Sequence, residues 1–150
     1  MSVELVLKLE HREPADYFEL QNAWKNKRDG TFGEFDGRTI AGLTFHRQFF
    51  LPRDEDFPMG ELFSTIDAEL DSGRFVIVSL WWGALYHMGV IADRTPSGEY
   101  RTVTKIGSGT YEMIDTKARI RAIKGTDIMT YVPAAAQKRA TAPTTRPTRG

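Results

Sequence analysis

Four consecutive apolar residues, Phe75 to Val78, constrain the fold more than any other feature of this sequence. A continuous apolar run of this kind is typical of a strand that is buried on both faces. The residues before it predict a helix over 59–72, because Leu62, Ile66 and Leu70 recur on one helical face and a glycine follows where a helix commonly ends. The chain therefore places a helix directly before a buried strand.

Other segments carry the patterns of strands and helices around this centre. Alternating apolar residues over 3–9 predict a strand with one buried face. The stretch from Pro14 to Gly30 predicts an N-terminal helix with one apolar face. Further strands are predicted at 40–51, 85–92, 99–106, 111–114 and 127–132, with 99–106 as the antiparallel partner of 85–92 across a Thr-Pro-Ser-Gly turn.

Segment 115–124 fits two patterns. Charged and apolar residues alternate along it, which is typical of a strand. However, Asp115 stands where a helix cap belongs, and a glycine follows the segment where a helix would stop. We favour the helix, whose buried side would hold Ala118, Ile120 and Ile123.

The length of 150 residues suits one domain with a single core. We assign 1–132 to an α+β domain in which an antiparallel sheet packs against N-terminal and middle helices. After Val132 the chain has no aromatic or large aliphatic residue, so 133–150 predicts a disordered basic tail rich in Pro, Thr and Ala. This tail is a solubilising extension or linker, or else a weak contact for nucleic acid or an acidic partner.

The charge balance does not favour nucleic acid or membrane as a partner. Lys and Arg total 20 and Asp and Glu total 20, so the formal net charge is zero. The first residues lack the basic and apolar regions of a signal peptide, and the longest apolar stretch, 75–86, is interrupted and too short to cross a bilayer. We expect a cytoplasmic protein whose partner is a peptide or another protein.

The chain contains no cysteine, which excludes a disulfide scaffold, a thiolate metal site and a thiol nucleophile on this chain. The three histidines, His11, His46 and His87, are dispersed without metal-ligand spacing, so no metal site is predicted. Neither a Walker A nor a dinucleotide-binding glycine motif is present, and we expect no cofactor. The acidic run Asp54-Glu55-Asp56 predicts a solvated loop.

Segment 59–92 has the order of elements found in one peptidase family. A helix ends in Leu70-Asp71-Ser72-Gly73-Arg74, the apolar strand follows, and His87 opens the next strand. This pattern resembles the C39-like, bacteriocin-processing branch of papain-like cysteine peptidases. The resemblance covers roughly residues 59–132. It implies a papain-like α+β fold and places His87 at the position of the general base.

The papain-like mechanism needs a nucleophile, an imidazole and a residue that orients the imidazole. The family's cysteine would head the N-terminal helix, near Ala15 or at Ala23, and neither position holds a thiol. An orienting acid or amide is missing from 102–107, and Asp93 and Asp115 are the nearest acids along the chain. A serine nucleophile at Ser79 or Ser108 is conceivable, although no G-x-S-x-G elbow is present.

The sequence therefore favours a catalytically inactive cysteine-peptidase-like domain that binds a peptide or protein. Trp81, Trp82 and Tyr86 are the candidate binding residues, and one of the adjacent tryptophans is expected in the core and the other at the surface. Two alternatives remain: an active hydrolase or transferase of the same fold with a mutated or non-thiol nucleophile, and an unrelated small interaction or immunity module. In the last case His87 would be a packed structural residue.

Overall fold

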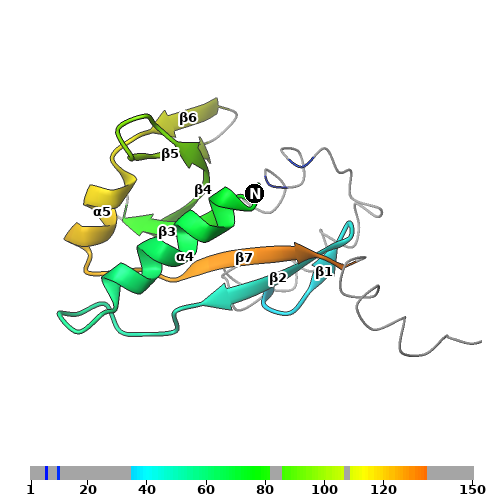
Figure 1. Cartoon of the computed structure of the whole chain (residues 1–150), viewed down its shortest axis with the longest axis horizontal. Coiled ribbons are helices and arrows are strands. Elements are labelled where there is room, and N and C mark those ends of the chain that lie inside the picture. The colour runs from blue at the N-terminus through cyan, green and yellow to red at the C-terminus, as the bar shows by residue number, and fades with distance from the viewer. Residues whose placement is uncertain (1–5, 7–9, 11–34, 82–85, 107–108, 135–150) are drawn as a thin grey trace, which may run out of the picture.

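The computed structural model describes residues 6, 10, 35–81, 86–106 and 109–134 (Figure 1). They form a seven-stranded sheet in the order β1-β2-β7-β3-β4-β5-β6, in which every neighbouring pair is antiparallel. The strands are β1 (Thr39–Ile40), β2 (Leu43–Gln48), β3 (Val76–Trp81), β4 (Tyr86–Arg94), β5 (Tyr100–Ile106), β6 (Gly109–Met113) and β7 (Ile128–Pro133). The helices are α4 (Met59–Asp71) and α5 (Thr116–Ala122). The α+β class and the antiparallel sheet predicted from the sequence are confirmed.

The apolar run forms a strand that is buried on both faces, as predicted, and this strand lies at the centre of the sheet. Strand β3 lies between β7 and β4, and its residues Val76, Ile77 and Val78 are buried. Successive side chains of a strand point to opposite faces. Val76 and Val78 therefore pack in the cluster that contains Leu62 and Ile66 of α4 and Ile120 of α5, whereas Ile77 packs in a cluster with Val90, Met129, Phe35 and Val6. A core on each face explains why β3 carries no polar alternation.

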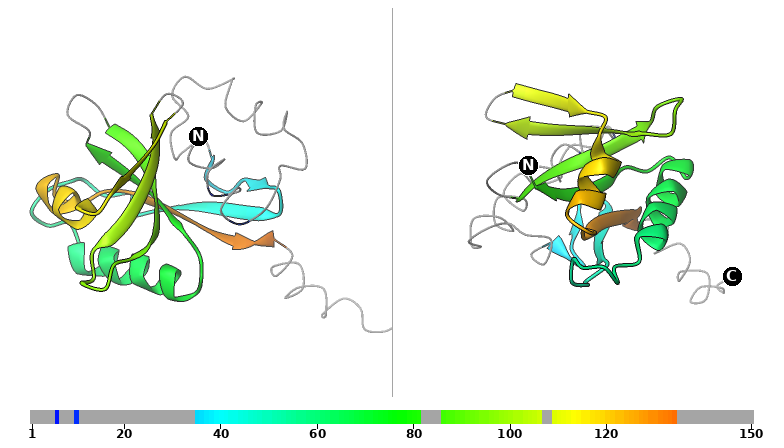
Figure 2. Two further views of the ribbon diagram at one scale, coloured as in Figure 1. Left: turned by 90° about the horizontal axis from the view of Figure 1, so that it is seen from above. Right: turned by 90° about the vertical axis from the view of Figure 1, so that its left-hand side faces the viewer.

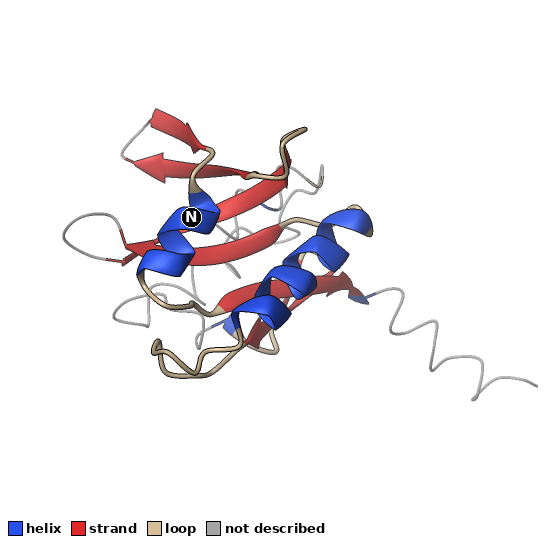
Figure 3. Ribbon diagram, turned by 60° about the vertical axis from the view of Figure 1, so that its left-hand side comes forward, coloured by secondary structure: helices blue, strands red, loops and turns tan. Residues whose placement is uncertain are grey.

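Both helices lie on the same face of the sheet (Figures 2 and 3). The predicted middle helix is confirmed: α4 buries Leu62 and Ile66, and it ends before Gly73, whose φ of 82° lies in the left-handed region. We call this side of the sheet the helix face and the other side the opposite face. The opposite face carries the cluster that includes Phe35 and Val6.

The strand predicted over 40–51 is confirmed only for 43–48, which form β2, and its extent as one continuous strand is wrong. The chain turns at Ala41 and Gly42, whose φ angles are 51° and 83°, and so forms a hairpin between β1 and β2. Two central residues with positive φ are typical of the type I′ turn. This turn is common in two-residue hairpins because its backbone twist matches the twist of the two strands that it joins. The apolar residues on both sides of this turn hid it from pattern analysis.

The helix favoured for 115–124 is confirmed as α5, but its buried side differs from the prediction. Thr116 and Ile120 are buried, whereas Ala118 is exposed. The hydroxyl groups of Thr116 and Thr102 are 2.5 Å apart and share a hydrogen bond, so the first turn of α5 is joined to β5 by a polar contact. Pattern analysis could not find Thr116, because it searches for apolar residues.

The hairpin predicted for 85–106 is confirmed as β4 and β5, and β6 and β7 match the predicted 111–114 and 127–132 closely. The predicted N-terminal helix falls outside the described residues, as does the predicted tail after Ala134. The first residue assigned to the tail, Pro133, is instead the last residue of β7. For the predicted strand over 3–9, the described residues are Val6 and, just beyond it, Glu10. The backbone N–H of Glu10 donates to the carbonyl of Val6 over 2.8 Å, which is a helical spacing rather than that of a strand.

Candidate functional site

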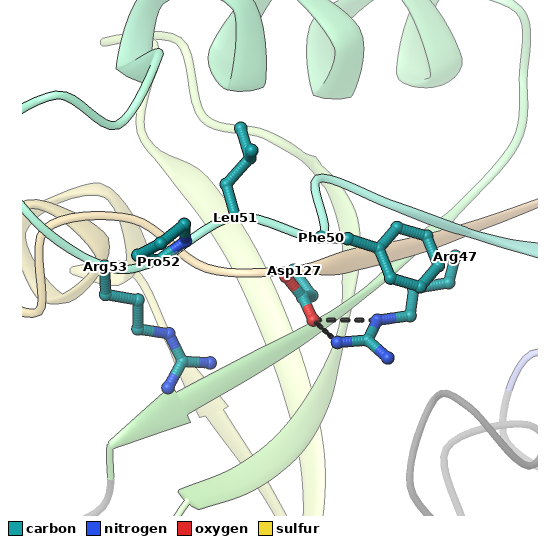
Figure 4. A pocket seen from close by; sticks show the side chains of 6 residues that line it. All are labelled: Arg47, Phe50, Leu51, Pro52, Arg53 and Asp127. Atoms are coloured by element: carbon teal, nitrogen blue, oxygen red, sulfur yellow. Dashed lines mark hydrogen bonds and ion pairs between the residues drawn. The ribbon is translucent and has the colours of Figure 1, made fainter.

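An open hollow of about 710 Å³ lies where β2 ends and β7 begins (Figure 4). We call it the hollow; its lining residues are Arg47, Phe50, Leu51, Pro52, Arg53 and Asp127. Arg47 is opposite Met129 in the register of β2 and β7, and Met129 is opposite Ile77 in that of β7 and β3. Residues opposite each other on neighbouring strands project from the same face, and Met129 and Ile77 belong to the cluster on the opposite face. Arg47 therefore also projects from the opposite face. In Figure 4 the side chains of Arg47, Arg53 and Asp127 extend away from the helix, while Leu51 extends toward it.

The backbone at Phe49 builds the wall of the hollow. Its φ of 63° is uncommon for a bulky residue, and the N–H of Leu51 donates to the Phe49 carbonyl over 2.8 Å, so the chain turns sharply where β2 ends. As a result Phe49 packs against the helix-face cluster, with its ring 6.0 Å from that of Phe57. Phe50 is left 58% exposed, and the guanidinium of Arg47 lies 4.1 Å from its ring centroid.

An ion pair between two residues of the lining joins β2 to the residue that precedes β7. Arg47 Nε donates to Asp127 Oδ2 over 2.8 Å, and Nη2 of the same arginine donates to the same oxygen. The backbone N–H of Arg47 donates to Asp36 Oδ1 over 2.9 Å. The Arg47 and Asp127 side chains are 29% and 17% exposed, so water screens this pair less than a surface pair.

Replacing Asp127 with asparagine is expected to lower the free energy of unfolding by about 1–2 kcal/mol, because a charge-assisted hydrogen bond is lost and Arg47 is left partly buried. Asp93→Asn is the matched control, because the Asp93–Arg101 ion pair is more exposed to solvent. The Asp93 side chain is 54% exposed and the Arg101 side chain 42%. It should cost less than about 0.5 kcal/mol. Urea unfolding of both variants measures the difference, and equal losses would contradict a special role for the Asp127 pair.

Arg53 connects the hollow to an exposed aromatic pair. Its guanidinium lies 4.1 Å from the ring centroid of Tyr86, and the Tyr86 ring packs edge-on against Trp81 at 5.1 Å. Arg53 Nη2 also reaches the hydroxyl of Thr126 over a long 3.4 Å. Thr126 is buried and donates its hydroxyl hydrogen to the Ser79 carbonyl over 2.5 Å. We call Phe50, Trp81 and Tyr86 the aromatic rim.

The structure brings together two of the predicted binding residues. Trp81 and Tyr86 face each other in the β3–β4 register, and they are 40% and 46% exposed. Trp82 lies outside the described residues, so the predicted division of the tryptophans between core and surface stays a prediction.

His87 points away from the aromatic rim. It follows Tyr86 directly on β4 and is opposite Leu80 in the register, which places it on the helix face. Ser79 is opposite Met88, on the other face. A Ser79–His87 nucleophile and base pair is therefore not formed. Ser108 lies outside the described residues.

The two acids considered as partners of His87 are held elsewhere. Asp93 is six residues further along the same strand, roughly 20 Å away at the rise of a β-strand, and it pairs with Arg101. Asp115 accepts a hydrogen bond from Arg119 Nε over 3.0 Å within α5. Across the described ranges, no three histidine, aspartate or glutamate side chains gather as a metal site.

Arg47, Phe50, Arg53 and Asp127 were not predicted as site residues from the sequence. Arg53 and Tyr86 are 33 positions apart, and Arg47 and Asp127 are 80 positions apart, so their contacts depend on how the strands pair. The one local signal was the Phe49-Phe50-Leu51-Pro52 run at the end of a predicted strand, since a strand buried on one face cannot bury three adjacent large side chains.

Comparison of the chain with protein-family models, with curated proteins and with solved structures found no significant match. Neither of the helices described above, nor any other in the described part of the chain, is long and apolar enough to cross a bilayer.

Proposed function

We propose that this chain is a non-catalytic binding domain of papain-like type that takes a peptide or protein partner at the hollow and its aromatic rim. The observation that carries the proposal is the grouping of exposed apolar side chains. Six large apolar residues of the described chain are exposed, and four of them line the hollow or stack onto it: Phe50, Leu51, Tyr86 and Trp81.

The chemistry of this surface suits a partner protein better than a small molecule. The hollow is open to solvent, whereas sites for small molecules are usually enclosed. Tryptophan, tyrosine and arginine side chains are enriched among the residues that dominate the energetics of protein interfaces. The aromatic rings bury a large area and lose little conformational entropy, and the arginine guanidinium supplies several hydrogen-bond donors. Arg47 and Arg53 lie against Phe50 and Tyr86, so the rings are held in place before a partner arrives.

The papain-like part of the proposal rests on the order α4, β3, β4, with His87 as the second residue of β4. The non-catalytic part rests on the absence of cysteine and on Ser79 and His87 facing opposite sides of the sheet. Nothing in the described geometry favours the active hydrolase or transferase.

A display selection tests the proposed function. The full chain is used to enrich binders from a random linear peptide library, and the dissociation constant of each enriched peptide is measured for variants. Trp81→Ala is expected to weaken binding by about thirty-fold, which is the loss typical of an interface hot spot. Tyr111→Ala is the matched control, because Tyr111 is 52% exposed on β6, outside the rim, and its loss should leave binding unchanged.

Three results would contradict the proposal. The first is equal weakening by Trp81→Ala and Tyr111→Ala, provided that both variants melt at the temperature of the wild type. The second is that the selection enriches no peptide at all. The third is hydrolysis of the enriched peptides, detected by mass spectrometry, that disappears in a His87→Ala variant.

A further inference from the structure

We propose that Arg53 makes the hollow specific for an acidic peptide, in which an aspartate or glutamate carboxylate binds the guanidinium and neighbouring apolar side chains bind the aromatic rim. This inference rests on the proposed function and specifies the chemistry of its partner. The occupant is a linear segment of another protein.

Arg53 is not held by an acid. Within the described residues it forms no ion pair; its contacts are the Tyr86 ring and the long hydrogen bond to Thr126. Five other arginines of the described chain are ion-paired, namely Arg47, Arg74, Arg94, Arg101 and Arg119. Arg121 instead lies over the Phe63 ring, away from the hollow. Arg53 therefore presents hydrogen-bond donors to solvent at the edge of an apolar surface, where a carboxylate could accept their hydrogen bonds.

Arg53 is already positioned before a partner binds. Its guanidinium lies over the Tyr86 ring, 4.1 Å from the centroid, and this contact reduces the side-chain entropy that is lost when a carboxylate binds. Thr126, which holds the other contact, is itself buried and bonded to Ser79. A flexible surface lysine or arginine would lack both constraints.

Three of the nearby acids make contacts of their own. Asp127 pairs with Arg47. In the loop after Arg53, Asp54 Oδ1 accepts the N–H of Asp56 over 2.9 Å, and Glu55 pairs with Lys124. The charged residues that line the hollow are Arg47, Arg53 and Asp127, two cations and one anion, so the charge of the lining itself is positive.

Other occupants fit less well. A nucleic acid would need a row of cations for successive phosphates, whereas the hollow offers one arginine not paired with a described acid. The basic tail of this chain carries the same sign of charge as Arg53 and no acid. A second copy of the chain could bring its acidic loop, Asp54-Glu55-Asp56, and the test below separates that case.

Binding of synthetic peptide pools tests the inference. The probes are fluorescein-labelled pools of short random peptides that are identical except for a central Glu, Gln or Lys, and the readout is fluorescence anisotropy with the full chain. We expect the Glu pool to bind about ten-fold more tightly than the Gln pool, because one charge-assisted contact is added. The Lys pool should bind most weakly, and the preference for Glu should shrink at high salt.

Variants assign the preference to its residue. Arg53→Gln should remove the difference between the Glu and Gln pools, while Arg53→Lys should keep a reduced preference, because it retains the charge and loses the planar stack. Arg101→Gln is the matched control, since Arg101 is an exposed arginine on β5 outside the hollow. It should leave the preference intact, and thermal melts confirm that each variant is folded.

Each contrary outcome has a distinct meaning. Equal binding of the Glu and Gln pools overturns the inference, and so does a preference for Glu that survives Arg53→Gln. In either case the proposed function stands if Trp81→Ala still weakens the binding of every pool. Binding of no pool overturns both. A dimer in solution that Arg53→Gln dissociates would assign the hollow to a second copy and also overturn the inference.

Discussion

Replacing Gly125 with alanine is expected to lower the free energy of unfolding by about 3–5 kcal/mol, the largest effect of any single substitution considered for this chain. Gly125 follows α5 with a φ of 113°, a conformation that side chains of L-residues rarely adopt. A Cβ atom there would also overlap the ring of Phe57. Phe57 is buried against the helix-face cluster, so the ring cannot move aside without disturbing the start of α4.

Gly98→Ala separates the backbone effect from the steric one. Gly98 has a φ of 88° in the turn before β5, and a Cβ added to it meets no atom within 4 Å. We expect a loss of about 1–2 kcal/mol from strain alone. Chemical denaturation of both variants measures the two losses. Equal values would contradict the close packing of Phe57 on Gly125.

Alkaline pH is expected to destabilise the fold steeply through Tyr100 and Tyr131. Burial raises the pKa of Tyr131 above its usual 10.0, and the hydrogen bond that its hydroxyl donates to Glu10 raises it further. Burial likewise raises the pKa of Tyr100, as does the hydrogen bond from its hydroxyl to Asp67 Oδ1 over 2.9 Å. Both phenols therefore keep their protons in the folded state at a pH where the unfolded chain loses them.

The sign and the pH range follow from these raised pKa values. Below pH 10 both states hold the phenolic protons, and the stabilisation is fully present. As the pH rises above 10, the unfolded state ionises and the free energy of unfolding falls by about 1.4 kcal/mol per pH unit for each tyrosine, or about 2.8 kcal/mol for the two. Urea unfolding at a series of alkaline pH values measures this slope.

Single tyrosine variants provide the control. Tyr131→Phe and Tyr100→Phe should each halve the slope above pH 10, although each also loses a hydrogen bond and about 1 kcal/mol at neutral pH. Tyr111→Phe removes an exposed phenol of β6 and should leave the slope unchanged. A slope that persists in the double variant of Tyr100 and Tyr131 would show that other groups cause the alkaline unfolding.

Much of the fold was predictable because its patterns are local. The Phe75–Val78 run predicted the central strand, and the spacing of Leu62 and Ile66 predicted α4. The turn at Ala41 and Gly42 was missed, because apolar residues continue on both sides and Gly42 alone is a weak signal. The buried Thr116 was missed because its partner Thr102 is on another element.

The candidate site was predictable only in part. Trp81 and Tyr86 were found as conspicuous aromatic residues beside a strand, and the register of β3 and β4 joins them. Arg53 and Asp127 belong to the site because of contacts between segments that are distant in the sequence. Arg53 contacts Tyr86, and Asp127 pairs with Arg47. The resemblance to papain-like peptidases directed attention to His87, which lies on the other face of β4 from the aromatic rim.

The central claim is that partners bind at the hollow and its rim rather than beside His87. Nuclear magnetic resonance of the isotope-labelled full chain, titrated with one peptide enriched by display, tests it most directly. We predict that shift changes concentrate at Phe50, Arg53, Trp81, Tyr86 and Asp127, while the imidazole of His87 stays unchanged. Shift changes centred on His87 and the helix face, with the rim unaffected, would contradict the account.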